Sequence, residues 1–210
     1  LLEKASQLKY DAAPVKRLGV PAYNYWNEAL HGVARAGVAT MFPQAIAMAA
    51  VFDDEEMKKV GDIIATEGRA KYNAYSAKED RDIYKGLTLW APNINIFRDP
   101  RWGRGHETYG EDPYLISQMG IHYIKGMQGA DKEGVACIAK HFLGYAESQG
   151  GLNCAVSRIN DRELYETFAT PFEAAANEAD VSGMMANYGE IDGQCVGANK
   201  KIARTLLRDT

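Results

Sequence analysis

Four short apolar runs, separated by longer amphipathic stretches, constrain the fold of this chain more than any other feature of its sequence. The runs are LGVPAYNY (18–25), LTLWAPN (87–93), GVACIAKHF (134–142) and VSGMMANY (181–188). They are mostly apolar rather than alternating, which is typical of strands buried on both faces. Such strands in alternation with helices predict an α/β fold with a parallel sheet and helices outside it.

The stretches between the runs carry helix start signals. Asp53 is an N-cap candidate ahead of an amphipathic stretch, and Asp112 precedes Pro113 at a first helical position. Asn160 and Glu163 resemble a capping pair, in which each side chain can bond the other residue's backbone N–H. We therefore expect a helix to begin after each of these three caps.

The order of these elements leaves two architectures open. The segment 199–209 also has apolar residues at helical spacing, and the chain has no repeat, low-complexity tract or linker. We therefore expect residues 1–210 to form a single domain. An open doubly wound sheet and a (β/α)8 barrel both fit, and both place their sites at the carboxyl ends of the strands.

Composition excludes some classes of partner. The net charge of −4 argues against nucleic acid or an anionic membrane, since both require clustered basic residues. No apolar stretch approaches the roughly 20 residues that span a bilayer, and the charged first residues are unlike a signal peptide. Cys137, Cys154 and Cys195 are too few and too scattered for a disulfide framework or a zinc site, and they leave the cellular compartment undecided.

Polar side chains follow each apolar run. Glu28 comes after the first run, the segment RDPRWGRGHE with Arg104 after the second, Lys140 and His141 at the end of the third, and Tyr188 at the end of the fourth. If the strands are parallel and adjacent, these groups converge on one rim. Carboxylates and cations bond hydroxyls in pairs, and aromatic faces cover the apolar side of a sugar ring, so such a rim suits a ligand rich in hydroxyls.

Other interpretations of these residues remain open. The charged residues of the loop can instead form a structural ion-pair network that pins it: Arg98, Asp99, Arg101, Arg104, Glu107, Glu111 and Asp112. Glu28 and His31 stand three apart, as helical metal ligands do, but no third ligand accompanies them, so we expect no metal. Neither a GxGxxG nor a GxxxxGK[ST] motif occurs, and we expect no cofactor.

Four segments in this order resemble glycoside hydrolase family 3, the β-glucosidase and β-xylosidase family. They are YNYWNEALHGVARAGVATMFPQAIAMAAVFD (23–53), APNINIFRDPRWGRGHETYGEDPYL (91–115), GVACIAKHFLGY (134–145) and MMANYGEIDG (184–193). The combination of RDPRWGR, ETYGED and KHF is highly specific, and the similarity covers nearly the whole chain, from about 18 to 209.

The resemblance implies a (β/α)8-like barrel, the first domain of a retaining exo-glycosidase. It implies that Glu28 and Arg104 hold hydroxyls of the terminal sugar, that Lys140 and His141 bind neighbouring hydroxyls, and that Tyr188 lines the site. The substrate would be an oligosaccharide or an aryl or alkyl β-glycoside. The start of RDPRWGR, residues 98–100, looks structural.

The family's catalytic carboxyl groups are not recognisable in these 210 residues. The family's nucleophile is the Asp of an SDW-like motif, and no S-D-W, S-D-Y or S-D-C occurs here. We expect no catalytic residue in this chain and no hydrolysis by it alone. A (β/α)8 barrel typically needs about 250 residues, so we expect an incomplete barrel, to be completed by a longer chain or by partner chains. A carbohydrate-binding protein without catalysis and a split enzyme are the alternatives.

Position 28 bears on the sugar. Glu28 is one methylene longer than the Asp common in glucose-specific members of the family, and its carboxylate could crowd the hydroxymethyl group that distinguishes glucose from xylose. We therefore favour a β-xylosidase, with arabinosidase activity as an addition, over a β-glucosidase. Differences of this size bias specificity by about 10- to 200-fold.

Overall fold

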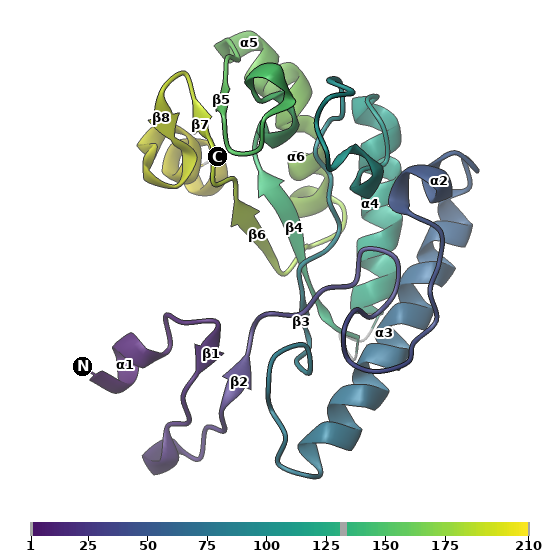
Figure 1. Cartoon of the computed structure of the whole chain (residues 1–210), viewed down its shortest axis with the longest axis vertical. Helices are drawn as coiled ribbons and strands as arrows, with labels where there is room; N and C mark the ends of the chain where they lie inside the picture. Colours follow the sequence, from purple (N-terminus) through teal and green to yellow (C-terminus); the bar gives the residue numbers. More distant parts are fainter. Residues whose placement is uncertain (1, 131–133, 210) are drawn as a thin grey trace.

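A parallel sheet lies at the centre of the computed structural model, which describes residues 2–130 and 134–209. Strands β3 (Thr88–Leu89), β4 (Ala136–Phe142) and β6 (Gly183–Ala186) pair in the order β3-β4-β6 (Figure 1). A parallel bridge from Asn27 to Leu89 adds the preceding segment beside β3. Each strand therefore lies next to its successor in the chain. A barrel keeps this chain order all the way round, whereas a doubly wound sheet reverses it at a switch point, and the strands described here show no such reversal.

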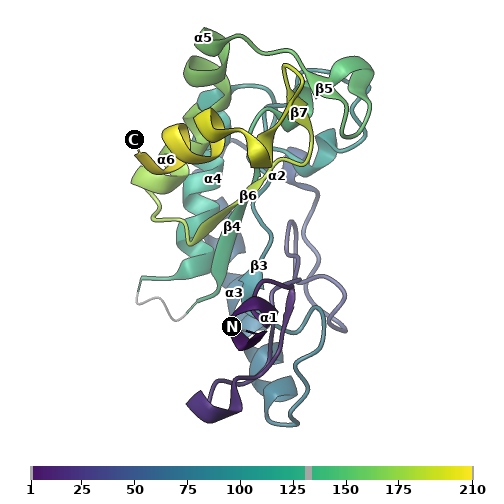
Figure 2. The ribbon, with the colours of Figure 1, turned by 90° about the vertical axis from the view of Figure 1, so that its left-hand side faces the viewer.

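Three helices cover one face of this sheet in chain order (Figures 1 and 2). Helix α3 (Asp54–Ser76) packs against α4 (Pro113–Gln128), and α4 packs against α6 (Thr170–Asn177). The main hydrophobic core fills the space between helices and strands and includes Ile64, Leu89, Ile124, Cys137 and Phe172, all buried. The chain thus forms consecutive βα units of a partial barrel.

Two glycines set the close approach of α3 and α4. A Cβ atom on Gly61 would lie 2.6 Å from the carbonyl oxygen of Tyr123, and one on Gly126 would overlap the carbonyl oxygen of Lys58. The two backbones therefore touch at this crossing, which only residues without a side chain permit.

The predicted helix caps are confirmed. The side-chain oxygens of Asp53, Asp112 and Asn160 each accept a hydrogen bond from the backbone N–H three residues later, at 2.9, 2.7 and 3.0 Å. The segment after Asn160 differs from a plain helix: a short α5 (Asp161–Glu163) leads into the π-helical η5 (Leu164–Phe168) before α6 begins. The C-terminal helix at 201–209, η7, is π-helical as well.

The prediction of a buried strand at 18–25 is wrong. The 3₁₀ helix η1 (Lys16–Leu18) ends there at Gly19, whose backbone is left-handed, and most side chains of the segment are exposed. Strand β2 (Tyr23–Asn24) pairs antiparallel with β1 (Asp11–Ala12), outside the parallel sheet. The apolar residues of this segment therefore belong to a hairpin, and the chain reaches the parallel sheet further along, at the bridge of Asn27.

The remaining elements are short. They are α1 (Leu2–Ser6), α2 (Ala45–Ala49), β5 (Val156–Ser157), β7 (Glu190–Ile191), β8 (Gln194–Cys195) and the 3₁₀ helices η2 (Gly105–Glu107), η3 (Tyr145–Glu147), η4 (Gln149–Gly151) and η6 (Val196–Ala198). Strands β5, β7 and β8 form a second small sheet.

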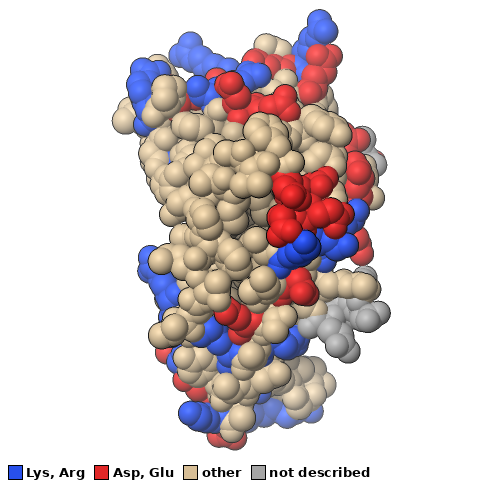
Figure 3. Space-filling view, turned by 90° about the vertical axis from the view of Figure 1, so that its right-hand side faces the viewer, with Lys and Arg blue, Asp and Glu red and all other residues tan. Residues whose placement is uncertain are grey.

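The face of the molecule shown in Figure 3 carries charges of both signs. On the face shown in Figure 3, basic side chains lie in small groups next to acidic ones. Among the described residues, no helix combines the length and the apolar character that crossing a membrane requires.

Candidate functional site

The carboxyl ends of the parallel strands carry the candidate site residues. Glu28 follows the bridge at Asn27, Lys140 and His141 lie near the end of β4, and Tyr188 comes two residues after β6. Arg104 lies in the loop after β3 and is the N-cap residue of η2. Because the strands are parallel and adjacent, all of these positions lie at the same edge of the sheet.

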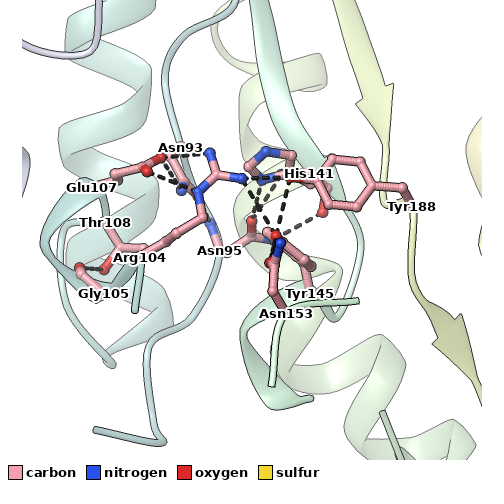
Figure 4. A network of polar contacts seen from close by, with 10 residues as sticks. All are labelled: Asn93, Asn95, Arg104, Gly105, Glu107, Thr108, His141, Tyr145, Asn153 and Tyr188. Atoms are coloured by element: carbon pink, nitrogen blue, oxygen red, sulfur yellow. Dashed lines mark hydrogen bonds and ion pairs between the residues drawn. The ribbon is translucent and has the colours of Figure 1, made fainter. Parts of the chain in front are cut away.

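Arg104 is the centre of the polar network in Figure 4. Its Nε and Nη2 atoms donate to the two carboxylate oxygens of Glu107, both at 2.7 Å. Its Nη1 atom donates to the hydroxyl oxygens of Tyr188 at 2.5 Å and of Tyr145 at 3.4 Å. A paired contact of this kind fixes the plane of the guanidinium group as well as its position.

The ion pair of Arg104 and Glu107 overcomes the effect of burial on both groups. Burial alone would raise the pKa of Glu107, but the hydrogen bonds and charge of Arg104, with the charge of Lys140, outweigh it and lower the pKa. Burial would lower the pKa of Arg104, and the same contacts with Glu107 raise it instead. Both groups are therefore charged at neutral pH.

Lys140 is an ammonium group held in a buried position. Its residue is 3% exposed, and burial lowers the pKa of its side chain to about 8. The carboxylate of Glu107 opposes this shift, the charge of Arg104 adds to it, and the carboxylate of Glu28 opposes it again. Glu28 is half-buried, and its negative charge attracts the same ammonium group as Glu107 does.

His141 is held in place by Asn95, which lies in the segment after β3. The Asn95 side chain accepts from the His141 backbone N–H at 2.9 Å and donates to the His141 carbonyl oxygen at 2.9 Å. Nδ1 of the imidazole lies 2.9 Å from the same Asn95 oxygen. Burial, together with the charges of Lys140 and Arg104, lowers the pKa of His141 to about 2, so the ring is neutral in the physiological range.

Aromatic rings border this group of charges. The ring centroids of His141 and Tyr145 lie 4.7 Å apart, those of Tyr145 and Tyr188 4.9 Å, and those of His141 and Tyr188 5.6 Å. Tyr188 is 49% exposed, whereas Tyr145 is buried. The site therefore reaches solvent at Tyr188.

The structure brings the five predicted site residues to one edge of the sheet: Glu28, Arg104, Lys140, His141 and Tyr188. The contacts above also include residues for which sequence reasoning predicted no site role. Glu107 appeared only within a possible ion-pair network, and Asn95 and Tyr145 were not singled out. The signal that could have revealed Glu107 is its position three residues after Arg104, since a 3₁₀ turn places such residues on one side.

Part of the charged loop is structural, as predicted. Asp99 and Arg101 pair with each other at 2.7 Å, and Arg98 pairs with Glu163 at 3.0 Å. The structure thus divides the loop: its first residues hold the loop in place, and Arg104 with Glu107 faces the strand ends.

Residues 3–210 of the chain match the family described as the glycosyl hydrolase family 3 N-terminal domain. The chain is 40% identical to a probable exo-1,4-β-xylosidase, bxlB, of Aspergillus terreus, in a match that covers 100% of this chain and 28% of that protein. It is 38% identical to a xylan 1,4-β-xylosidase of Xylanibacter ruminicola, in a match that covers 99% of this chain and 25% of that protein. The chain thus spans about a quarter of the length of these relatives.

Solved structures agree on the fold. An exo-β-xylosidase, XlnD, in complex with a xylobiose aziridine probe superposes with a TM-score of 0.85 at 35% identity, over 99% of this chain and 28% of the other. A β-glucosidase of Erythrobacter marinus gives a TM-score of 0.80 at 37% identity, over 92% of this chain and 24% of the other. With consecutive βα units, RDPRWGR and KHF at the strand ends, and a family match over nearly every residue, the chain belongs to glycoside hydrolase family 3, as part of its N-terminal barrel domain.

Proposed function

We propose that this chain carries the sugar-binding half of the active site of an exo-acting β-xylosidase. The observation that carries the proposal is the convergence of Arg104, Lys140 and Glu28, partly or fully buried charges of both signs, at one end of a parallel sheet. Charges are rarely removed from water without a partner, and a ligand with several hydroxyls can donate to the carboxylate and accept from the cations. Xylose is proposed as the sugar because several of the named relatives are β-xylosidases.

The roles of the five residues follow from their hydrogen-bonding capacity. Glu28 accepts from sugar hydroxyls, and Arg104 and Lys140 donate to hydroxyl oxygens. His141 contacts a neighbouring hydroxyl, and Tyr188 borders the ring from the solvent side. Because Glu107 and Asn95 hold Arg104 and His141 in place, the site is already ordered before a sugar enters, which lowers the entropic cost of binding.

Cleavage requires groups that these five residues do not supply. Retaining glycosidases use two carboxyl groups about 5 to 5.5 Å apart, one as nucleophile and one as acid and base. The chain has no SDW-like motif, and Glu28 is assigned here to binding. We therefore expect residues 1–210 alone to bind but not to hydrolyse glycosides, with the nucleophile contributed by a longer form of the chain or by a partner chain.

A β-glucosidase is the second candidate, favoured by the 37% identity to the Erythrobacter marinus enzyme. The test compares kcat/KM of the full-length gene product on aryl β-xyloside and aryl β-glucoside. We expect a xyloside preference, which Glu28→Asp reduces or reverses by about 10- to 200-fold, because the shorter side chain leaves room for the hydroxymethyl group.

Two outcomes would contradict the proposal. A glucoside preference in the unmodified protein would favour the second candidate. Binding of xylosides without turnover by the full-length gene product would identify a carbohydrate-binding protein that lacks catalysis.

A further inference from the structure

We propose that Asn95 is a positioning residue that makes His141 a pure hydrogen-bond acceptor toward the sugar. The inference rests on the proposed function, because it assigns the direction of one hydrogen bond within that site. It also identifies which chemical feature of the ligand the site reads at His141, namely a hydroxyl group that donates its proton.

The backbone of β4 fixes which end of the Asn95 amide faces the imidazole. Asn95 Nδ2 donates to the carbonyl oxygen of His141, and Asn95 Oδ1 accepts from the backbone N–H of His141, both at 2.9 Å. A flipped amide would place NH₂ against N–H and oxygen against oxygen, so the assignment is unambiguous. Asn95 is 2% exposed and His141 is 1% exposed, so water does not compete for these bonds.

The tautomer of His141 follows from this orientation. Nδ1 of His141 lies 2.9 Å from Asn95 Oδ1, an atom that can only accept. Nδ1 must therefore carry the ring hydrogen, and a neutral imidazole then has a bare lone pair on Nε2. The ring is neutral because burial and two neighbouring cations, Lys140 and Arg104, disfavour a further positive charge.

The groups around His141 are consistent with Nε2 as a hydrogen-bond acceptor. Lys140 precedes it on β4, Arg104 lies in the loop before η2, and the rings of Tyr145 and Tyr188 pack against it. Both cations are donors only, so they contact sugar oxygens by donation. Among the basic side chains of this group, His141 differs in that its Nε2 atom accepts. The hydroxyl that faces His141 is therefore read as a donor, as is one that faces Glu28, whereas hydroxyls that face Lys140 or Arg104 are read as acceptors.

Deoxy and deoxyfluoro analogues of methyl β-xyloside test this assignment in the full-length gene product. Fluorine accepts hydrogen bonds weakly and cannot donate. At the ring position that faces His141, the deoxyfluoro analogue should inhibit as poorly as the deoxy analogue, each about ten-fold weaker than the parent. At positions that face Lys140 or Arg104, the fluoro analogue should be the better inhibitor of the two.

The variant Asn95→Asp changes the direction of the bond. A carboxylate opposite Nδ1 favours the charged imidazole, whose Nε2 atom carries a hydrogen and donates. As the pH is lowered, the fluoro analogue should gain over the deoxy analogue at the His141 position in this variant only. The control is Asn187→Asp: Asn187 is also 2% exposed, and its amide likewise donates to a backbone carbonyl, Leu143 O, and accepts from a backbone N–H, that of Gly189, but without the imidazole contact that Asn95 makes. It should leave the fluoro-to-deoxy ratio unchanged.

Neutron diffraction from crystals grown in D₂O reads the tautomer directly, without any variant. Deuterium on Nδ1 and none on Nε2 of His141 is the expected result. Deuterium on Nε2, or fluoro analogues that outperform deoxy analogues at every ring position, would overturn the assignment. If no xyloside analogue binds at all, the proposed function fails, while the neutron map still decides the role of Asn95.

Discussion

Replacing Glu107 by glutamine tests whether the paired contact with Arg104 organises the site. The wild-type pair has two charge-assisted hydrogen bonds of 2.7 Å, and the side chains are only 25% and 15% exposed. Glutamine keeps one acceptor oxygen but places an NH₂ group against the guanidinium, and it removes the negative charge. The guanidinium then loses one of the groups that fix its direction.

The magnitude follows from the geometry. A hydrogen bond to a charged group contributes about 1.5 to 3 kcal/mol, and partial exposure of the pair reduces the value toward the lower half of that range. We expect a loss of about 2 kcal/mol, which corresponds to about a 30-fold fall in kcat/KM for aryl β-xyloside if Arg104 contacts the sugar. The free energy of unfolding should fall by a similar or smaller amount.

The effect of Glu107→Gln on the free energy of unfolding should depend on pH in a defined direction. Because the folded pKa of Glu107 is lowered, its contribution to stability is present above the unfolded pKa of about 4.3 and is lost as the pH falls through the folded pKa. The stability difference between wild type and variant should therefore shrink in acid. Denaturant unfolding at several pH values measures it.

Glu111→Gln is the matched control, because Glu111 lies in the same loop and is exposed. It should change kcat/KM by less than about two-fold, as surface substitutions usually do. If Glu107→Gln leaves kcat/KM within that margin, or if both variants lose activity equally, the reasoning about Arg104 is refuted.

Two further predictions concern Lys140 and the helix crossing. Since burial lowers the pKa of Lys140 to about 8, its ammonium deprotonates as the pH rises through that value, and 1/KM should fall there. Lys140→Arg stays charged and should abolish this fall in 1/KM at alkaline pH. A fall that persists unchanged in the variant would contradict the assignment. Gly126→Ala should lower the free energy of unfolding by about 1 to 3 kcal/mol, because its Cβ would overlap the Lys58 carbonyl oxygen. The control Gly197→Ala has open space around it and should leave the free energy of unfolding unchanged. Equal effects of the two variants in chemical unfolding would argue against a tight crossing of α3 and α4.

The features that sequence reasoning predicted well are set by local chemistry. The caps at Asp53, Asp112 and Asn160 depend on residues within one turn, so a short stretch of sequence contains all the information. Strand β4 was found because it lies within a mostly apolar run, 134–142, of the length that a buried strand has. The edge on which the site lies followed from parallel strands alone.

The features that were missed depend on partners distant in the sequence. The run at 18–25 is apolar enough for a strand, but it includes the left-handed Gly19 and pairs with β1 in a hairpin instead of joining the parallel sheet. The role of Asn95 depends on His141, which lies 46 residues away, and no spacing rule connects them. Single-sequence patterns report on periodicity and turns, and they do not report which strand lies beside which residue.

The chain-order adjacency of the strands bears on how this domain is made. Each strand finds its neighbour already translated, since β4 pairs with β3 and β6 with β4. During synthesis on the ribosome, each new βα unit can dock onto the one that emerged before it, without waiting for a distant segment. Sequential docking of this kind keeps loop-closure distances short, and it leaves a single growing sheet edge for chaperones to shield at any moment.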